Sequence, residues 1–390
     1  MVASLILEDE LQEDSDNSAS PSHSGFGLNR FNLIYRKRGL QAFKSLRPRY
    51  IEGVGRGITL IRIGDEVECP LMGCIAFGVI DRGTNLLQIR PTTLCPLNCI
   101  FCSTDAGPKS RTRLAEYVVA LEPLLELVDR VVEYKGRRGI EAHIDTVGEP
   151  ATYPRLIELI QGLREIEGVE TISMQTNGVL LDERLIEEMA EAGMDRLNVS
   201  IHALDEEIAR RMVGASSYPL RRILELCEHI VDVGIDLLIA PVWLPGVNDG
   251  EMPRIIEYAK SIGAGRRWPP LGIQRYEAHK RGRRPKGVRP ISWSRFYHEL
   301  REMERRYGVK LILRPEDFGI HPRRMYPIPY RRGEMAKVRV IAPGWRRGEA
   351  LAVGRGRAIT IVGVRAFNIG EKMRVRIIGN KHNIILARPI

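Results

Sequence analysis

The chain has 390 residues, a formal net charge of +10 and 44% hydrophobic residues. This length allows about two or three domains. No run of 18 apolar residues occurs, so the composition excludes a membrane-spanning helix. The charge is uneven: residues 266–390 hold 31 Lys or Arg against 9 Asp or Glu, whereas residues 1–265 hold 28 against 40. This asymmetry favours an anion-binding C-terminal part.

The N-terminal segment divides into two parts. Residues 1–25 are acidic and then rich in serine, which predicts a disordered leader. They lack the basic start and apolar core of a signal peptide. Residues 26–85 are expected to form an N-terminal extension that is partly β. Within it, Cys69 and Cys74 could be two ligands of a second cluster, a disulfide pair or buried core residues.

Apolar runs alternate with amphipathic stretches from residue 86 to about residue 315. This rhythm predicts an α/β fold with a parallel sheet whose faces are covered by helices. In such a sheet, ligands gather at the carboxyl ends of the strands. The expected strands are Leu86–Arg90, Ala142–Thr146, Thr171–Gln175, Arg196–Ile201, Asp236–Val242, Gly272–Arg275 and Lys310–Leu313. The expected helices are Tyr153–Ile166, Asp182–Ala192, Pro219–Val233 and Glu251–Ile262.

Three cysteines follow the first of these strands. Cys95, Cys99 and Cys102 have the spacing C-x3-C-x2-C. Three thiolates this close in sequence can hold one cubane iron–sulfur cluster and leave the fourth iron open for chemistry. A structural cluster or zinc site needs a fourth soft ligand, and residues 103–114 contain neither Cys nor His. The spacing therefore favours the open cluster.

This cysteine run resembles the signature of radical S-adenosylmethionine (SAM) enzymes, including the aromatic Phe101 before the third cysteine. The resemblance implies a partial (β/α)6 TIM-type barrel in which Cys95, Cys99 and Cys102 ligate a 4Fe–4S cluster. It implies that SAM binds the fourth iron, with Phe101 close to its adenine. A reducing electron donor is then needed to generate a 5′-deoxyadenosyl radical from SAM. Such a cluster also implies a reducing, cytoplasmic location.

Later strand ends carry groups that match the same family. Gly148-Glu149-Pro150 resembles the Gly-Gly-Glu-Pro motif that contacts the SAM amino group, but Val147 replaces its first glycine. Thr176-Asn177-Gly178 resembles a segment found after the next strand in the family. The resemblance therefore implies that Gly148 and Glu149 bind SAM, whereas each motif alone is also an ordinary turn.

Two further strands extend the expected cofactor site. Alternation along the strand points Asn198, Ser200 and His202 to one side, and Ser200 matches a family position that contacts SAM. His202 is either a substrate group or a structural histidine. The segment 241–249 resembles that of molybdopterin-precursor enzymes, which implies backbone contact between Val242 and the SAM adenine.

The C-terminal segment predicts a small all-β barrel. Residues 316–336 are expected to be a linker, and residues 337–390 contain five short alternating strands. This segment resembles a TRAM domain, a module attached to several tRNA-modifying enzymes. The expected strands are Val338–Ile341, Ala350–Val353, Ala358–Val362, Lys372–Ile378 and Ile384–Arg388.

Basic residues near this barrel suggest an RNA partner. The stretch 266–289 interleaves Lys and Arg with aromatic residues, a composition that suits phosphates and stacked bases. A solvated basic loop in an Arg-rich, hot-adapted protein is the simpler alternative. The candidate RNA contacts are Arg281, Arg283, Arg284, Arg355, Arg357 and Arg374.

Three hypotheses follow from these features. The first is a radical SAM enzyme that modifies a nucleoside in tRNA or rRNA, without a DNA partner. The second is a radical SAM enzyme that acts on a small anionic metabolite or cofactor precursor. The third is a non-catalytic RNA-binding protein with a structural cluster, which the Gly148-Glu149 motif disfavours.

Overall fold

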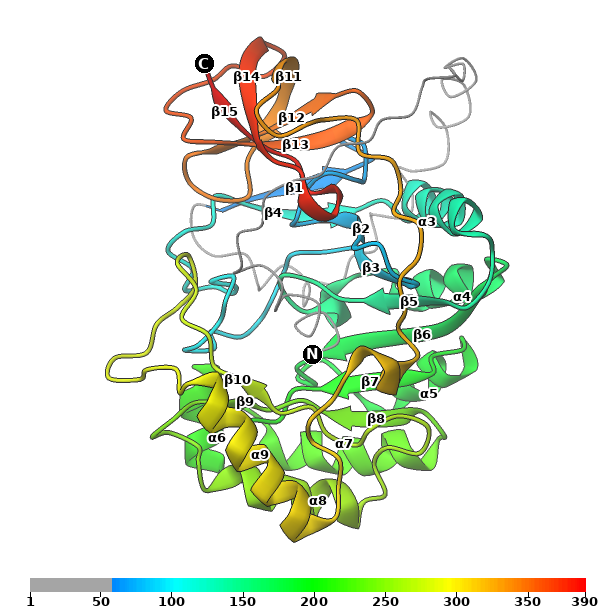
Figure 1. Cartoon of the computed structure of the whole chain (residues 1–390), viewed down its shortest axis with the longest axis vertical. Coiled ribbons are helices and arrows are strands. Elements are labelled where there is room, and N and C mark those ends of the chain that lie inside the picture. Colours follow the sequence, from blue (N-terminus) through cyan, green and yellow to red (C-terminus); the bar gives the residue numbers. More distant parts are fainter. Residues whose placement is uncertain (1–57) are drawn as a thin grey trace.

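The computed structural model describes residues 58–390 (Figure 1). The expected leader, and the part of the extension before residue 58, lie outside the described residues. A six-stranded sheet forms the centre of the molecule, in the order β2-β3-β5-β6-β7-β8. Its strands are β2 Gly78–Asp81, β3 Leu86–Arg90, β5 Ile140–Ile144, β6 Val169–Thr176, β7 Arg196–Val199 and β8 Asp236–Ile239.

The pairing agrees with the α/β fold expected from the sequence. Strands β3, β5, β6, β7 and β8 pair in parallel in this order, and β2 adds an antiparallel edge. Two short parallel ladders join β9 Val242–Trp243 to β10 Gln274–Arg275, and β1 Thr59–Ile63 to β4 Ala115–Val119. The helices are α3 Leu121–Lys135, α4 Leu156–Glu165, α5 Glu183–Glu191, α6 Glu206–Val213, α7 Leu220–Asp232, α8 Glu251–Ser261 and α9 Trp293–Tyr307.

The helices cover one face of the sheet with amphipathic stripes. Helix α7 buries Ile223, Leu226, Cys227 and Ile230 in the main core. Helix α5 begins after Asp182, whose carboxylate accepts a hydrogen bond of 2.9 Å from the amide of Leu185.

One expected strand is absent and several elements were not predicted. Lys310–Leu313 is not a strand: the Glu304 carboxylate accepts from the backbone amides of Leu311 and Ile312, and those amides are then not available to a sheet. Leu313 instead packs with Phe318. The expected strand 236–242 divides into β8 and the start of β9. Strands β1 and β2 lie in the extension that was expected to be partly β, for which no strand bounds were given. Elements β4, α3, α6 and α9 were not expected.

The C-terminal residues form the expected small barrel. Five strands close in the order β11-β12-β13-β15-β14, around buried residues that include Val340, Ile359 and Val375. The strands are β11 Met335–Pro343, β12 Glu349–Gly354, β13 Arg357–Val362, β14 Lys372–Gly379 and β15 Leu386–Pro389.

This barrel packs directly on the edge formed by β1, β4 and β2 (Figure 1). The Tyr117 hydroxyl on β4 donates to the carbonyl of Pro343 at 2.9 Å. The amide of Ala358 donates to the carbonyl of Met72, and Trp345 and Leu351 belong to the main core. The barrel therefore keeps a core of its own, and residues at the junction join it to the main core. No helix in residues 58–390 is long and apolar enough to cross a membrane.

Candidate active site

The three cysteines lie in the loop that follows β3, at the carboxyl end of the parallel sheet. Cys95 is buried, and Cys99 and Cys102 are half-buried. The loop is anchored to the end of α6, because the amides of Asn98 and Ile100 donate to backbone carbonyls at 3.0 and 2.9 Å. Burial raises the pKa of Cys99 to about 12, and the neighbouring Cys102 adds to this shift. Burial and the neighbouring Cys99 also raise the pKa of Cys95.

Two glycines allow other segments to press on this loop. A Cβ atom on Gly148 would lie 2.2 Å from the carbonyl oxygen of Leu94, and one on Gly214 would lie 2.3 Å from that of Asn98. Any side chain at these positions would collide with backbone. The close approach places the Gly148-Glu149 turn directly beside the cysteine loop, where the resemblance requires it.

Glu149 joins the ends of two neighbouring strands, β5 and β6. Its buried carboxylate accepts hydrogen bonds from the amide of Ala151 (3.0 Å), the Thr176 hydroxyl (2.7 Å) and the amide of Asn177 (2.7 Å). Burial outweighs these three donors and raises the pKa of Glu149 to about 7. All three donors are neutral, so a cationic ligand group at this carboxylate would be favourable.

The remaining predicted cofactor residues are Phe101 in the cysteine loop, Ser200 directly after β7, and Val242 at the start of β9. Phe101 packs edge-to-face on His202, with ring centroids 4.8 Å apart. The Nδ1 atom of His202 accepts from the amide of Val242 at 3.1 Å, which brings Phe101, His202 and Val242 into one contact chain. Burial lowers the pKa of His202 to about 4, so this histidine is neutral at pH 7. The Ser200 hydroxyl accepts from Gln175 Nε2 at 3.0 Å.

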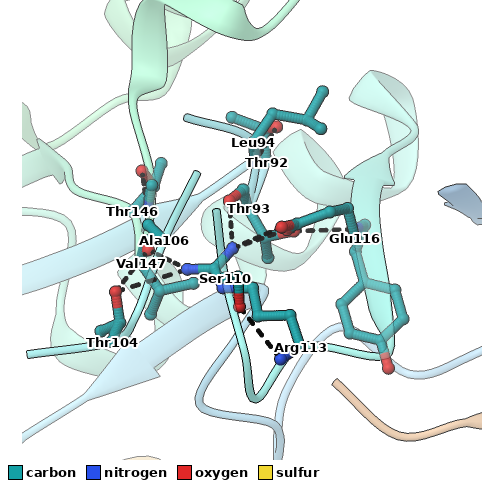
Figure 2. Close-up of polar contacts among 12 residues, drawn as sticks. Thr92, Thr93, Leu94, Thr104, Ala106, Ser110, Arg113, Glu116, Thr146 and Val147 are labelled. Carbon is teal, nitrogen blue, oxygen red and sulfur yellow. Dashed lines mark hydrogen bonds and ion pairs between the residues drawn. The ribbon is translucent and has the colours of Figure 1, made fainter. Parts of the chain in front are cut away.

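A buried arginine that the sequence analysis missed ties these loops together (Figure 2). Arg113 donates through Nη1 to the carbonyl of Thr93 at 2.7 Å and pairs with the Glu116 carboxylate at 2.6 Å. Its Nη2 atom donates to the carbonyl of Val147 at 2.6 Å. Thr93 is two residues before Cys95 and Val147 directly precedes Gly148. The guanidinium of Arg113 thus connects the cysteine loop to the Gly148-Glu149 turn. Its contact in that turn is the carbonyl of Val147, the residue that replaces the first glycine of the Gly-Gly-Glu-Pro motif.

The donor set fits an iron–sulfur cluster. Three neighbouring thiols are soft ligands of the kind that hold such clusters, and cluster binding would overcome the raised pKa values of Cys95 and Cys99. Within the described residues, no three His, Cys, Asp or Glu side chains gather closely enough to hold a single metal ion. Cys95, Cys99 and Cys102 would hold the cluster at this place, and its iron would supply the redox chemistry.

A sequence-family model agrees with this geometry: residues 89–259 match the model described as "Radical SAM superfamily". Residues 89–259 form a radical SAM superfamily domain. The protein is a radical SAM enzyme, and its cofactors are a 4Fe–4S cluster and SAM. Enzymes of this superfamily also need a reductant.

Individual relatives are informative to different degrees. The chain is 43% identical over 341 residues to "Uncharacterized protein MJ0103" of Methanocaldococcus jannaschii, an alignment that covers 82% of this chain and 79% of the relative. It is 30% identical over 184 residues to "GTP 3′,8-cyclase" of Aquifex aeolicus, covering 47% of this chain and 55% of the cyclase. A crystal structure of Streptococcus suis SuiB bound to S-adenosylmethionine matches 58% of this chain and 48% of that chain, with 17% identity and a TM-score of 0.44. That structural similarity is too low to support an inference.

Several of the arginines proposed to contact RNA form ion pairs or hydrogen bonds within the protein itself. Arg283 pairs with Asp105 at 2.8 Å and donates to the carbonyls of Cys99 and Ala106, so it braces the cysteine loop. Arg281 pairs with Glu349 on the C-terminal barrel. Arg355 pairs with Glu334 at 2.6 Å, and Arg357 donates to the carbonyl of Pro327 at 2.5 Å. Arg284 and Arg374 are exposed, and Arg284 donates to the carbonyl of His279.

The remaining cysteine pair lies at the junction with the C-terminal barrel. Cys69 and Cys74 are buried free thiols, and the Thr360 hydroxyl of β13 lies 3.9 Å from the Cys74 sulfur. Burial raises the pKa of Cys74 to about 11. Among the three interpretations of this pair, the structure agrees with buried core residues and shows no disulfide.

Proposed function

We propose that this radical SAM enzyme modifies a nucleoside within tRNA or rRNA, and that its C-terminal barrel holds the RNA. The observation that carries the proposal is a cationic face on that barrel. Six exposed side chains form it: two come from β11, three from β14, which pairs with both other strands, and one from β15. They are Lys337, Arg339, Lys372, Arg374, Arg376 and Arg388.

The strand register places like charges directly opposite one another on this cationic face. Lys337 pairs with Arg374 and Arg339 with Lys372 across β11 and β14, and Arg376 pairs with Arg388 across β14 and β15. Like charges in such positions destabilise a sheet by a few tenths of a kcal/mol or more per pair. Within residues 58–390, none of the six forms an ion pair. A bound polyanion would relieve this repulsion, and phosphate contacts dominate the affinity of RNA-binding proteins.

The cationic face gives a salt-dependence prediction. We expect the triple variant Lys337→Gln, Lys372→Gln, Arg374→Gln to lower the slope of log affinity against log salt by about 2, because each lost single-strand phosphate contact removes about 0.7. RNA binding is measured by fluorescence anisotropy over a range of salt concentrations. The same variant should be slightly more stable to denaturant, by about 0.5 kcal/mol, because two repulsive cross-strand pairs disappear.

A matched variant controls for net charge. Arg184→Gln, Arg210→Gln, Arg221→Gln removes the same charge from exposed helix positions of the core, where each arginine pairs with a glutamate on its own helix. Its salt slope should equal that of the wild type. Equal slopes for the wild type and the cationic-face variant would contradict the role of this face.

The reaction is tested with RNA as the variable. The reconstituted enzyme is reduced anaerobically, and 5′-deoxyadenosine is quantified with and without tRNA and rRNA from a strain that lacks the gene. Strong stimulation together with a mass change in one nucleoside is the expected result. SAM cleavage that is indifferent to RNA would contradict the proposal.

A second candidate function is action on a small anionic nucleotide or cofactor precursor. It is favoured by the alignment with the GTP 3′,8-cyclase of Aquifex aeolicus, which is 30% identical over 184 residues. The same assay separates the two candidates, because GTP replaces RNA as the added compound. Stimulation by GTP alone would favour this second function.

A further inference from the structure

The inner face of the six-stranded sheet is polar. Residues that face the helices, such as Ile89, Ile144 and Val199, belong to the main hydrophobic core. Their neighbours in sequence point the other way because side chains alternate along a strand. These inner side chains include charged and amide groups that are almost fully buried. Such groups are unusual in a parallel sheet, whose strands are mostly hydrophobic when both faces are covered. They are Gln88, Arg90, Glu141, His143, Ser173, Arg196 and Asn198.

Most of these inner groups satisfy one another. The Ser173 hydroxyl donates to Glu141 at 2.6 Å and lies 2.7 Å from His143 Nδ1. Arg196 pairs with Glu141 at 2.6 Å and donates through Nε to the Asn198 side-chain oxygen at 3.1 Å. This network holds the side chains at fixed positions on β5, β6 and β7.

Two amides in this network are oriented by their neighbours and keep one free group each. Gln175 on β6 lies directly opposite Asn198 on β7. Gln175 Nε2 donates to the carbonyl of Asn198 at 3.1 Å and to the Ser200 hydroxyl at 3.0 Å, so its oxygen is left over. The Asn198 oxygen is taken by Arg196, so its Nδ2 group is left over. Both remaining atoms are buried and have no hydrogen-bond partner among the described residues.

Unpaired buried polar atoms are costly, about 1–3 kcal/mol each, so two of them on directly opposite residues call for a ligand. One atom is an acceptor and the other a donor, and neither amide can rotate without losing its present bonds. A ligand that satisfies both atoms must present an N–H group to the acceptor and, next to it, a carbonyl oxygen or ring nitrogen to the donor. Nucleobases present such edges, and paired side-chain amides read bases in the same manner in nucleic-acid complexes.

We propose that Gln175 Oε1 and Asn198 Nδ2 together bind the hydrogen-bonding edge of the substrate nucleobase. This inference rests on the proposed function, because it takes the substrate to be a nucleoside. Gln175 directly precedes Thr176 on β6, and Asn198 lies two residues before Ser200, which follows β7. The base would therefore enter the sheet interior beneath the expected SAM position, which suits a base taken out of its stack.

The test uses nucleosides in which the edge is intact or blocked. Binding of uridine and 3-methyluridine, and of guanosine and 1-methylguanosine, is measured by calorimetry on the anaerobic holoenzyme with SAM bound. One parent nucleoside is expected to bind at least about tenfold more tightly than its N-methylated form, because a paired contact of this kind is worth about 1–3 kcal/mol. Equal binding of the parent and methylated forms, or no binding of either parent, would overturn the proposal.

The variant Asn198→Asp keeps the oxygen that Arg196 needs and replaces the free donor with an acceptor. We expect it to lose the preference for the parent nucleoside and to keep its SAM affinity. Asn380→Asp is the matched control, since that amide donates to the carbonyl of Tyr330 in the C-terminal barrel. A parallel loss of SAM affinity in Asn198→Asp would assign the amide pair to SAM and overturn the inference. Nucleoside discrimination without RNA stimulation would leave the inference standing and remove the RNA proposal.

Discussion

The variant Arg113→Met is expected to lower the free energy of unfolding by about 3–5 kcal/mol. Arg113 is fully buried, and its partner Glu116 is 1% exposed. Figure 2 shows the contact between the two side chains. Removing the guanidinium leaves a buried carboxylate whose remaining partner is the Thr93 hydroxyl. Burial already raises the pKa of Glu116 in spite of Arg113, so loss of the cation would drive this carboxyl group toward its neutral form.

The same variant should disturb the cofactor site, because the carbonyls of Thr93 and Val147 lose their shared donor. We expect reduced iron content after reconstitution and weaker SAM binding, seen as a smaller effect of SAM on the electron paramagnetic resonance spectrum of the reduced cluster. These readouts separate a role in positioning the two loops from stability alone.

Two further variants make the Arg113 result interpretable. Arg113→Met combined with Glu116→Leu should recover part of the stability, because the unpaired carboxylate accounts for much of the cost. Arg184→Met removes an exposed arginine from a helix ion pair and should cost at most about 0.5 kcal/mol. A cost below about 1 kcal/mol for Arg113→Met in denaturant unfolding would show that this pair does not stabilise the fold.

Local patterns along the chain predicted the fold well. The strand Leu86–Arg90, the parallel core and the five-stranded C-terminal barrel were all expected, because hydrophobic periodicity and turn residues are local signals. Lys310–Leu313 has the apolar pattern of a strand, but Glu304 binds its amides. That contact depends on where α9 ends, which the periodicity of residues 310–313 does not reveal.

The site was predicted only where a motif is contiguous. The cysteine spacing predicts the loop that would hold the cluster, whereas Arg113 acts through carbonyls 20 and 34 residues away in sequence. Arg283 is one of many basic residues in its stretch, and only folding turns it onto Cys99 and Ala106. The polar inner face did have a signal: Glu141 and His143, and Arg196 and Asn198, stand two residues apart on strands. Period-two polar residues in a covered parallel sheet could have indicated a binding face.

The last prediction concerns the proton on Glu149. Folding raises the pKa of this carboxyl group from 4.5 to about 7, so between these values the folded metal-free protein holds a proton that the unfolded chain has lost. The contribution of Glu149 is therefore most favourable below about pH 4.5 and is lost as the pH rises through 7. A shift of this size corresponds to about 3 kcal/mol.

The variant Glu149→Gln isolates this effect because glutamine does not titrate. The unfolding free energy of the wild type minus that of the variant should fall between pH 5 and pH 8 and level off above pH 8. Burial lowers the pKa of both His143 and His202 to about 4, so these histidines destabilise the folded protein as the pH falls below 6.5. This effect is opposite to that of Glu149. Subtracting the unfolding free energy of the variant removes it. Glu225→Gln, an exposed position on α7, serves as the control. A difference that stays constant with pH would mean that Glu149 remains ionised, and its neutral donors would then suffice to hold the charge without the SAM ammonium.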